Sequence, residues 1–347
     1  MFKNLILTIA FSLLTANLAF TSCKEKNKAN NNLNISIVSD SIIKIIPDTT
    51  NQKAPKESSM HQTAKAQRKP VAAKQDTAKT KKKPPVKELK FNPMKVNYPL
   101  RPEEMTEGLK KAEKGDLRGA LADFNKCIEK NPKNYNAYFY KAKALLELGD
   151  KAGAMENIEL AIANNKSQSL FYYYRGKMFF DAGNMEKAYA DFDTSAIMNP
   201  RFADAMNYRG VVKEIRGQHT EAIEDYDKAI QINPSFANAY YNKGTSQAAM
   251  EMYEEAIASL TKSIELDEKN VPALMNRGNC HVMLKNFNPA ISDFTSAISI
   301  NPKSADAYFN RGAAYQMSGD KNACSDWRKA QTLGHKKAAD MLMEYCK

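Results

Sequence analysis

Histidine, cysteine, tryptophan and glycine are all scarce in this chain of 347 residues. It contains four His, five Cys, one Trp and 14 Gly. None of the histidines, His61, His219, His281 and His335, lies at metal-ligand spacing from cysteines or carboxylates. No glycine-rich phosphate loop and no nucleophile-elbow motif is present. We therefore expect no metal, no cofactor and no enzymatic activity.

Acidic residues are scarce in one segment only. Residues 24–98 hold 17 Lys and Arg against six Asp and Glu, and Lys3 is the one charged residue before them. Residues 99–347 hold 33 of each sign, so the net charge of +12 belongs to the N-terminal part. Because the rest of the chain has no basic excess, the charge does not predict a nucleic-acid partner.

Aromatic residues are absent from residues 24–90, which are rich in Lys, Asn, Thr, Ala and Pro. Such a composition buries too little apolar surface to offset the entropy of ordering, so 23–98 is predicted to be a disordered tether. An apolar patch from Ile35 to Ile46 is either a sticky stretch of linker or a binding segment. The basic tether is either a soluble spacer or a segment that lies against anionic lipid or cell wall.

The first 22 residues are predicted to be a secretory signal peptide. Lys3 is followed by an apolar run from Leu5 to Phe20 and then by small residues. The ending Phe20-Thr21-Ser22-Cys23 resembles a bacterial lipobox, and the resemblance implies cleavage before Cys23 and lipidation of that residue. The alternative is an ordinary signal peptide with a chance cysteine. Lys24-Glu25-Lys26 loosely resembles a surface-export tag of Bacteroidetes lipoproteins.

A period of 34 residues organises the remainder of the chain. Small residues recur at this step at Gly108, Ala142, Gly176, Gly210, Gly244, Gly278 and Gly312. A second small column begins at Ala120, and a bulky column begins at Phe124. Within one unit the pattern predicts two helices: the first ends near Gly217, and the second ends at Asn233-Pro234 because the residue before Pro leaves the α region. A fixed period of this length predicts stacked repeats that bury their core between neighbours.

The phased columns resemble the tetratricopeptide repeat. The resemblance places repeats at 101–134, 135–168, 169–202, 203–236, 237–270, 271–304 and 305–338, with a capping helix at 336–347. It implies an all-α, right-handed solenoid of seven helix pairs. Glu251 and Lys285 depart from the turn glycine, and the last unit is one residue short, which brings Trp327 into the bulky column.

A basic column precedes the small one, and it looks at first like an anion-binding ladder. Its members are Lys141, Arg175, Arg209, Lys243, Arg277 and Arg311. Each Arg is accompanied by an Asp on the second helix of its own repeat, namely Asp191, Asp225, Asp293 and Asp326. Since the fork of Arg suits a carboxylate, we expect ion pairs inside the repeats rather than an open ladder.

Members of this family bind partners on the concave surface that their first helices line. The matching positions predict a groove of aromatic, Met and Lys side chains, formed by Phe139, Lys143, Tyr173, Lys177, Asn207, Tyr241, Met275, Asn279 and Phe309. Such a surface suits a peptide or a protein partner. The alternative is that these residues pack partly against the adjoining first helix. A clamp for C-terminal carboxylates is not expected, because Asn238, Pro272 and Asp306 stand where its Lys would be.

The remaining cysteines fit an exported protein. If the last two helices run antiparallel about Gly334, Cys324 and Cys346 come to the same end, and we expect a disulfide there. Cys127 and Cys280 lie in distant repeats and should be buried thiols. The whole sequence predicts a lipid-anchored protein-binding scaffold of the outer membrane that faces the periplasm or the cell surface. The alternative is a cell-wall or glycan-binding protein that uses the tether or aromatic positions such as Tyr173 and Tyr241.

Overall fold

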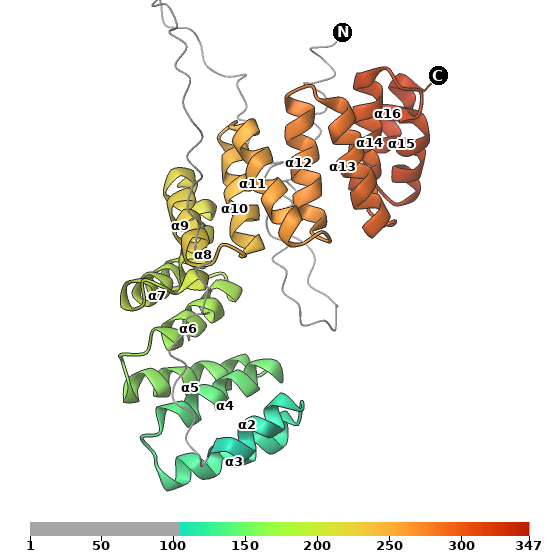
Figure 1. The fold of residues 1–347 in the computed structure, drawn as a ribbon. Coiled ribbons are helices and arrows are strands. Elements are labelled where there is room, and N and C mark those ends of the chain that lie inside the picture. Colours follow the sequence, from blue (N-terminus) through green and yellow to red (C-terminus); the bar gives the residue numbers. More distant parts are fainter. Residues whose placement is uncertain (1–104, 347) are drawn as a thin grey trace, which may run out of the picture. The chain divides into compact units, whose positions relative to one another are not determined.

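The computed structural model describes residues 105–346, which form helices and no strand (Figure 1). The predicted signal peptide, the lipidation site Cys23 and the tether lie outside the described residues. The helices of the first four pairs are α2 (Thr106–Glu113) and α3 (Leu117–Lys130), α4 (Tyr135–Glu147) and α5 (Lys151–Asn164), α6 (Ser169–Asp181) and α7 (Met185–Met198), α8 (Ala203–Ile215) and α9 (His219–Ile232). The later helices are α10 (Ala237–Ala249) and α11 (Tyr253–Leu266), α12 (Val271–Met283) and α13 (Phe287–Ile300), α14 (Ala305–Ser318) and α15 (Ala323–Thr332), and α16 (Ala338–Tyr345).

Each helix packs against the helices that precede and follow it in the chain. The first helices α8, α10, α12 and α14 also contact one another in series. This nearest-neighbour packing of helix pairs is a solenoid, and the predicted fold of seven helix-turn-helix repeats with a final capping helix is confirmed.

The turn inside each repeat needs a left-handed residue. Glycine holds φ between 75° and 85° in five repeats, at Gly115, Gly149, Gly183, Gly217 and Gly319. Glu251 and Lys285 adopt φ of 61° at the matching turns of the other two. A residue with a Cβ pays roughly 1 kcal/mol or more for this conformation, so the packing around these two turns outweighs local preference.

The small column lets the two helices of a repeat touch. A Cβ added to Gly210 would lie 2.7 Å from the Tyr226 ring, and one added to Gly278 would lie 2.6 Å from Phe294. Tyr226 and Phe294 are fully buried on the second helices. The small and bulky columns therefore form one contact, and a larger residue in the small column would force the helices apart.

Arginine and aspartate pair inside the repeats, as the sequence predicts. Arg175 donates from Nε and Nη2 to both oxygens of Asp191 at 2.8 Å. The three other pairs have the same forked geometry: Arg209–Asp225, Arg277–Asp293 and Arg311–Asp326. The basic column is therefore a structural element that ties the two helices of a repeat together.

The same column also joins neighbouring repeats, which the sequence pattern did not reveal. Arg209 donates a further bond to Asp193 of the preceding repeat at 2.6 Å. Lys243 makes the matching bond to Asp227 at 2.6 Å. Arg277 and Arg311 bond a threonine at that place, Thr261 and Thr295.

The C-terminal end of the array is closed by α16. A disulfide joins Cys324 at the start of α15 to Cys346 just after α16. Trp327 is fully buried, and its Nε1 donates to the carbonyl of Phe309 at 3.2 Å. Met341 of α16 is buried in the same cluster, so α16 covers the core of the seventh repeat.

Two other sequence expectations concern isolated side chains. Cys127 and Cys280 are buried and lie outside the disulfide, and burial raises the pKa of Cys280 to about 12. His281 is half-buried, and desolvation lowers its pKa. These groups are parts of the packing, as expected.

Candidate partner-binding surface

Five members of the predicted groove are buried. Phe139, Tyr173, Asn207, Tyr241 and Phe309 have at most 8% of their surface exposed. They do not line an open surface, so this part of the groove prediction is wrong. The physical reason is that their column faces the next first helix, where the stacking of repeats covers it.

The buried aromatics hold one repeat to the next. The Phe139 ring lies 5.0 Å from Phe171 and 5.2 Å from Tyr174 of the following repeat. Tyr173 in turn lies 5.7 Å from Tyr208 of repeat 4. These centroid distances are those of favourable aromatic pairs, and the rings therefore serve the stacking of the solenoid.

The other buried members make similar contacts. Phe309 stacks on His335 at 3.9 Å, next to the capping helix. Asn207 accepts a hydrogen bond from Asn242 at 2.9 Å. The Tyr241 hydroxyl is within 3.5 Å of the Asn276 amide that donates to it.

The remaining predicted residues, Lys143, Lys177, Met275 and Asn279, are half-buried. Next to them lies a column that the groove prediction did not include, whose members are half-buried except for the buried Asn242 and Asn276. That column lies one position after the buried one. It carries Tyr140, Tyr174 and Tyr208 in repeats 2 to 4, and Asn242, Asn276 and Asn310 in repeats 5 to 7.

In repeats 2 to 4 the accessible face is built from tyrosine and lysine. Lys143 Nζ lies 5.9 Å from the Tyr140 ring and 5.5 Å from the Tyr174 ring. Lys177 Nζ lies 5.8 Å from Tyr173 and 5.5 Å from Tyr208. Each lysine thus bridges rings of consecutive repeats by cation–π attraction. We call Tyr140, Lys143, Tyr174, Lys177 and Tyr208 the tyrosine–lysine strip.

In repeats 5 to 7 the matching positions carry amides and a hydroxyl, of which Asn242, Thr245 and Asn276 are buried and Asn279 and Asn310 are half-buried. Asn276 donates to Thr245 Oγ1 at 3.3 Å, and Thr245 donates to the Tyr241 carbonyl at 3.0 Å. Asn310 donates to Asn279 at 3.1 Å. We call Asn242, Thr245, Asn276, Asn279 and Asn310 the amide strip.

Burial shifts the pKa of Tyr208 in the tyrosine–lysine strip and of Asp204 beside it. Desolvation, with Asp181 and Asp204 nearby, raises the pKa of Tyr208 to about 12. Burial also raises the pKa of Asp204, and the charge of Lys177 opposes that shift. The strip therefore presents neutral hydroxyls and lysine cations with acidic neighbours, a surface suited to polar and aromatic contacts rather than to proton transfer.

Nothing in residues 105–346 resembles a catalytic or metal centre. No group of three or more His, Cys, Asp or Glu in that range is placed to hold a metal ion. Ser246 donates to Glu214, and Glu214 is 3.0 Å from His219. Because Glu214 lies between Ser246 and His219, the histidine is not placed to act as a general base for the serine, and the three residues do not form a catalytic triad. Among the same residues, no helix has the length and apolar composition to cross a bilayer.

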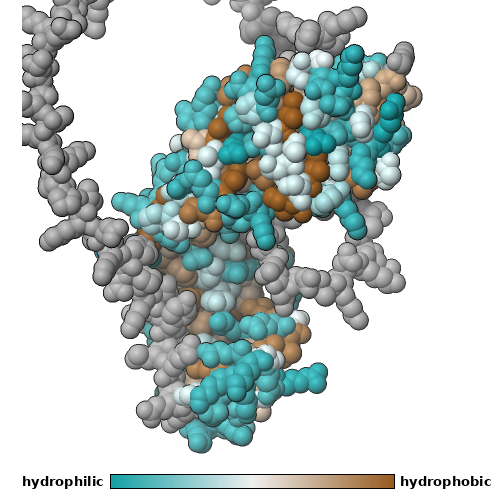
Figure 2. All heavy atoms as spheres, turned by 45° about the vertical axis from the view of Figure 1, so that its right-hand side comes forward, coloured by the Kyte–Doolittle hydropathy of each residue, from teal (hydrophilic) through white to brown (hydrophobic). Residues whose placement is uncertain are grey.

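Exposed apolar residues are scattered along the array and do not form one large patch. Figure 2 shows apolar patches separated by hydrophilic side chains on the face in view. The most exposed large ones are Ile197 at 68% and Met343 at 67%.

A change along one column was the signal that sequence reasoning missed. The step from Tyr140, Tyr174 and Tyr208 to three asparagines is visible in the printed sequence at a spacing of 34 residues. The structure shows the amides of these asparagines hydrogen-bonded to neighbouring side chains.

Comparison with protein families finds repeat models along the array. Models described as tetratricopeptide repeat match residues 124–156, 237–270, 271–304 and 294–324, and one described as TPR repeat matches 215–251. No curated protein matches the chain.

Solved structures of TPR proteins share the fold. The C-terminal part of a TPR repeat-containing protein from Cytophaga hutchinsonii is 20% identical with a TM-score of 0.55, covering 69% of this chain and 99% of that one. A tetratricopeptide repeat protein from Parabacteroides merdae is 20% identical with a TM-score of 0.51, covering 71% and 98%. Pseudomonas aeruginosa pilF is 16% identical with a TM-score of 0.54, covering 59% and 93%.

Proposed function

Because the chain belongs to the tetratricopeptide-repeat family, whose members mediate protein–protein interaction, we propose that it is a non-enzymatic scaffold that docks a partner protein or peptide on its first-helix face. The observation that carries this proposal is the tyrosine–lysine strip. Five half-buried side chains of three consecutive repeats form two sets of cation–π contacts there, and the buried Tyr173 ring, which contacts Tyr174 and Lys177, lies between the sets.

The strip has the chemistry of a protein-recognition surface. Tyrosines offer a large apolar ring and a hydroxyl at a small entropic cost, and they are common in binding hot spots. The lysines hold neighbouring rings in position, so little ordering is needed when a partner arrives. A segment that runs along the array would meet aromatic contacts on repeats 2 to 4 and the half-buried amides of Asn279 and Asn310 on repeats 6 and 7.

We further propose that the scaffold is anchored by lipid at Cys23 and held at the outer membrane, facing the periplasm or the cell surface. The supporting feature is the apolar run that ends in Phe20-Thr21-Ser22-Cys23. Acyl chains would serve as an anchor rather than a span. A flexible tether of about 75 residues would have an r.m.s. span on the order of 50 Å, enough to separate the array from the bilayer surface.

Crosslinking in cells tests the docking proposal. The intact chain and a Lys143→Glu, Lys177→Glu variant would be crosslinked, and the proteins recovered with each would be compared. We expect one dominant envelope protein with the native chain and at least a tenfold loss of it with the variant. Lys187→Glu is the matched control, since Lys187 makes a cation–π contact to Phe179 from second helix α7.

Retention of the same partner by the lysine variant would contradict docking on this strip. Recovery of cell-wall material in place of a protein would favour the glycan-binding alternative. Anchoring is tested separately by labelling cells with an alkyne fatty acid. The native chain should carry the label and Cys23→Ser should lose it, whereas equal labelling would refute lipidation at this residue.

A further inference from the structure

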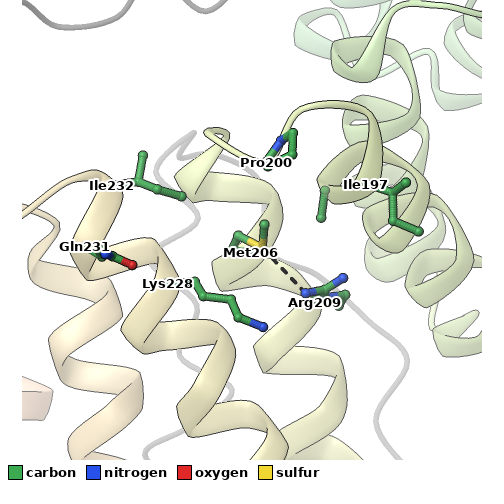
Figure 3. A pocket seen from close by; sticks show the side chains of 8 residues that line it. Ile197, Pro200, Met206, Arg209, Lys228, Gln231 and Ile232 are labelled. Carbon is green, nitrogen blue, oxygen red and sulfur yellow. Dashed lines mark hydrogen bonds between the residues drawn. The ribbon is translucent and has the colours of Figure 1, made fainter.

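A cleft of about 350 Å³ opens at the junction of repeats 3 and 4, where α7, α8 and α9 meet. Ala196 and Ile197 line it from α7, Met206 and Arg209 from α8, and Lys228 and Ile232 from α9. Figure 3 shows Met206, Arg209 and Lys228 gathered between Ile197 and Ile232. The cleft is lined by none of the residues of the tyrosine–lysine strip or the amide strip. We call it the junction cleft.

The cleft exists because two positions of the repeat carry smaller side chains at this junction than in most other repeats. Ala196 stands where five other repeats carry isoleucine, namely Ile128, Ile162, Ile230, Ile264 and Ile298. Met206 stands where four repeats carry tyrosine, namely Tyr138, Tyr172, Tyr240 and Tyr308. Since protein interiors are close-packed, losing three carbons in one column and a ring in the other leaves space.

The missing tyrosine also changes what covers the arginine. In repeat 3 the Tyr172 ring lies 5.6 Å from the Arg175 guanidinium, and in repeat 7 the Tyr308 ring lies 5.6 Å from Arg311. In repeat 4 the Arg209 Nη2 instead meets the Met206 sulfur at 3.5 Å. In repeats 3 and 7 a tyrosine ring lies against the guanidinium, whereas in repeat 4 that tyrosine is absent and Arg209 lines the cleft.

An exposed apolar residue stands at the rim. Ile197 is 68% exposed, at a place where the neighbouring repeats carry Ala163 and Gln231. A single exposed aliphatic side chain is ordinary on a protein surface, but this one lines the cleft and adds to its apolar wall. Three departures from the repeat pattern thus coincide at one junction.

Charge at the junction is also unusual. Asp225 is fully buried and is approached by Arg209 at 2.6 Å, Lys213 at 2.8 Å and Lys228 at 3.9 Å. Asp193 is the other carboxylate bonded to Arg209. Three cations against two carboxylates leave one positive charge in excess, and Lys228, about half exposed, presents it at the cleft.

We propose that the junction cleft is a second binding site, which takes an apolar side chain of a partner's peptide segment and places an adjacent carboxylate of that segment beside Lys228. The apolar wall selects a residue of the size of leucine or phenylalanine, and the excess charge selects acidic neighbours. This goes beyond docking on the first-helix face, and it holds whether or not the strips bind a partner.

Fluorescence anisotropy with the full chain tests the proposal. The probe is a fluorescein-labelled octapeptide with leucine and phenylalanine between glutamates. Ala196→Ile combined with Met206→Tyr refills the junction with the residues that other repeats carry, so the fold should be kept or stabilised. We expect this variant to weaken probe binding at least tenfold, with an unchanged or higher Tm.

Charge is tested by a matched pair of substitutions. Lys228→Glu should weaken the probe about tenfold, while Lys262→Glu, at the same place in the next repeat, should leave binding within twofold. An octapeptide with lysines in place of the glutamates should bind at least tenfold more weakly. The proposal is overturned if the refilled variant binds as well as the native chain, if both lysine variants weaken binding equally, or if dodecanoate binds and the peptide does not.

Discussion

Repeats 2 to 4 and repeats 5 to 7 have the same backbone plan but present different chemistry on their first helices. The first group offers rings bridged by Lys143 and Lys177, while the second offers asparagines that bond one another and Thr245. The turns differ as well: Gly149, Gly183 and Gly217 serve the first group, whereas the second includes Glu251 and Lys285. The positions whose side chains pack one helix against another carry similar residues in both groups, and the positions next to them differ.

Within the first group Arg209 links two repeats, because it bonds Asp193 of repeat 3 and Asp225 of repeat 4. Because Asp225 is fully buried, Arg209→Leu should cost about 3 kcal/mol and should weaken the junction of repeats 3 and 4. Lys243→Leu is the control at the same place in the next repeat, where the partner Asp227 is half exposed, and it should cost under about 1 kcal/mol. Equal losses in calorimetry would refute the linking role of Arg209.

Reduction of the Cys324–Cys346 disulfide should affect the second group alone. The bond closes a separation of 22 residues, for which loop entropy gives about 3 kcal/mol. Hydrogen exchange after reduction should show lost protection in α14 to α16 and unchanged protection in α4 to α7. A uniform loss of protection along the array would contradict nearest-neighbour stability.

The strips should differ in what they contribute to stability. Asn276 is buried and bonds Thr245 and Tyr241, so Asn276→Ala should cost about 1.5 kcal/mol. Lys177→Ala removes two cation–π contacts at a half-buried site and should cost about 0.5 kcal/mol. Urea unfolding of both variants checks this order, and a reversed order would show that the tyrosine–lysine strip is primarily structural.

Exchange of the turn residues should change stability by less than Asn276→Ala does. Glu251→Gly relieves a left-handed residue with a Cβ and should stabilise the second group by about 1 kcal/mol. Gly217→Glu should destabilise repeat 4 by a similar amount, since its φ is 75°. Midpoints of urea unfolding would report both changes, and a loss of stability in Glu251→Gly would mean that the Glu251 side chain makes a compensating contact.

Strict periodicity made the fold predictable. Columns such as Gly210 and Tyr226 repeat because each helix pair must fit the next, and the covariation of Arg with Asp was enough to predict Arg209–Asp225. The short last unit could be aligned because Trp327 falls in the bulky column, and the structure buries it there.

The binding surface was less predictable, since a column's exposure depends on the rotation of one repeat against the next. One position separates the buried Phe139 from the accessible Tyr140, and residue type does not tell them apart. The junction cleft depends on what is missing at Ala196 and Met206. A gap of that kind becomes visible when the structure brings two columns together.

Photocrosslinking from a single residue tests most directly whether the first-helix face docks a partner. Benzoylphenylalanine would replace Tyr174 on first helix α6 or, as the control, the half-buried Tyr189 on second helix α7. The account predicts a crosslink to one protein from position 174 and none to that protein from position 189. Crosslinks to the same protein from position 189 alone would contradict it.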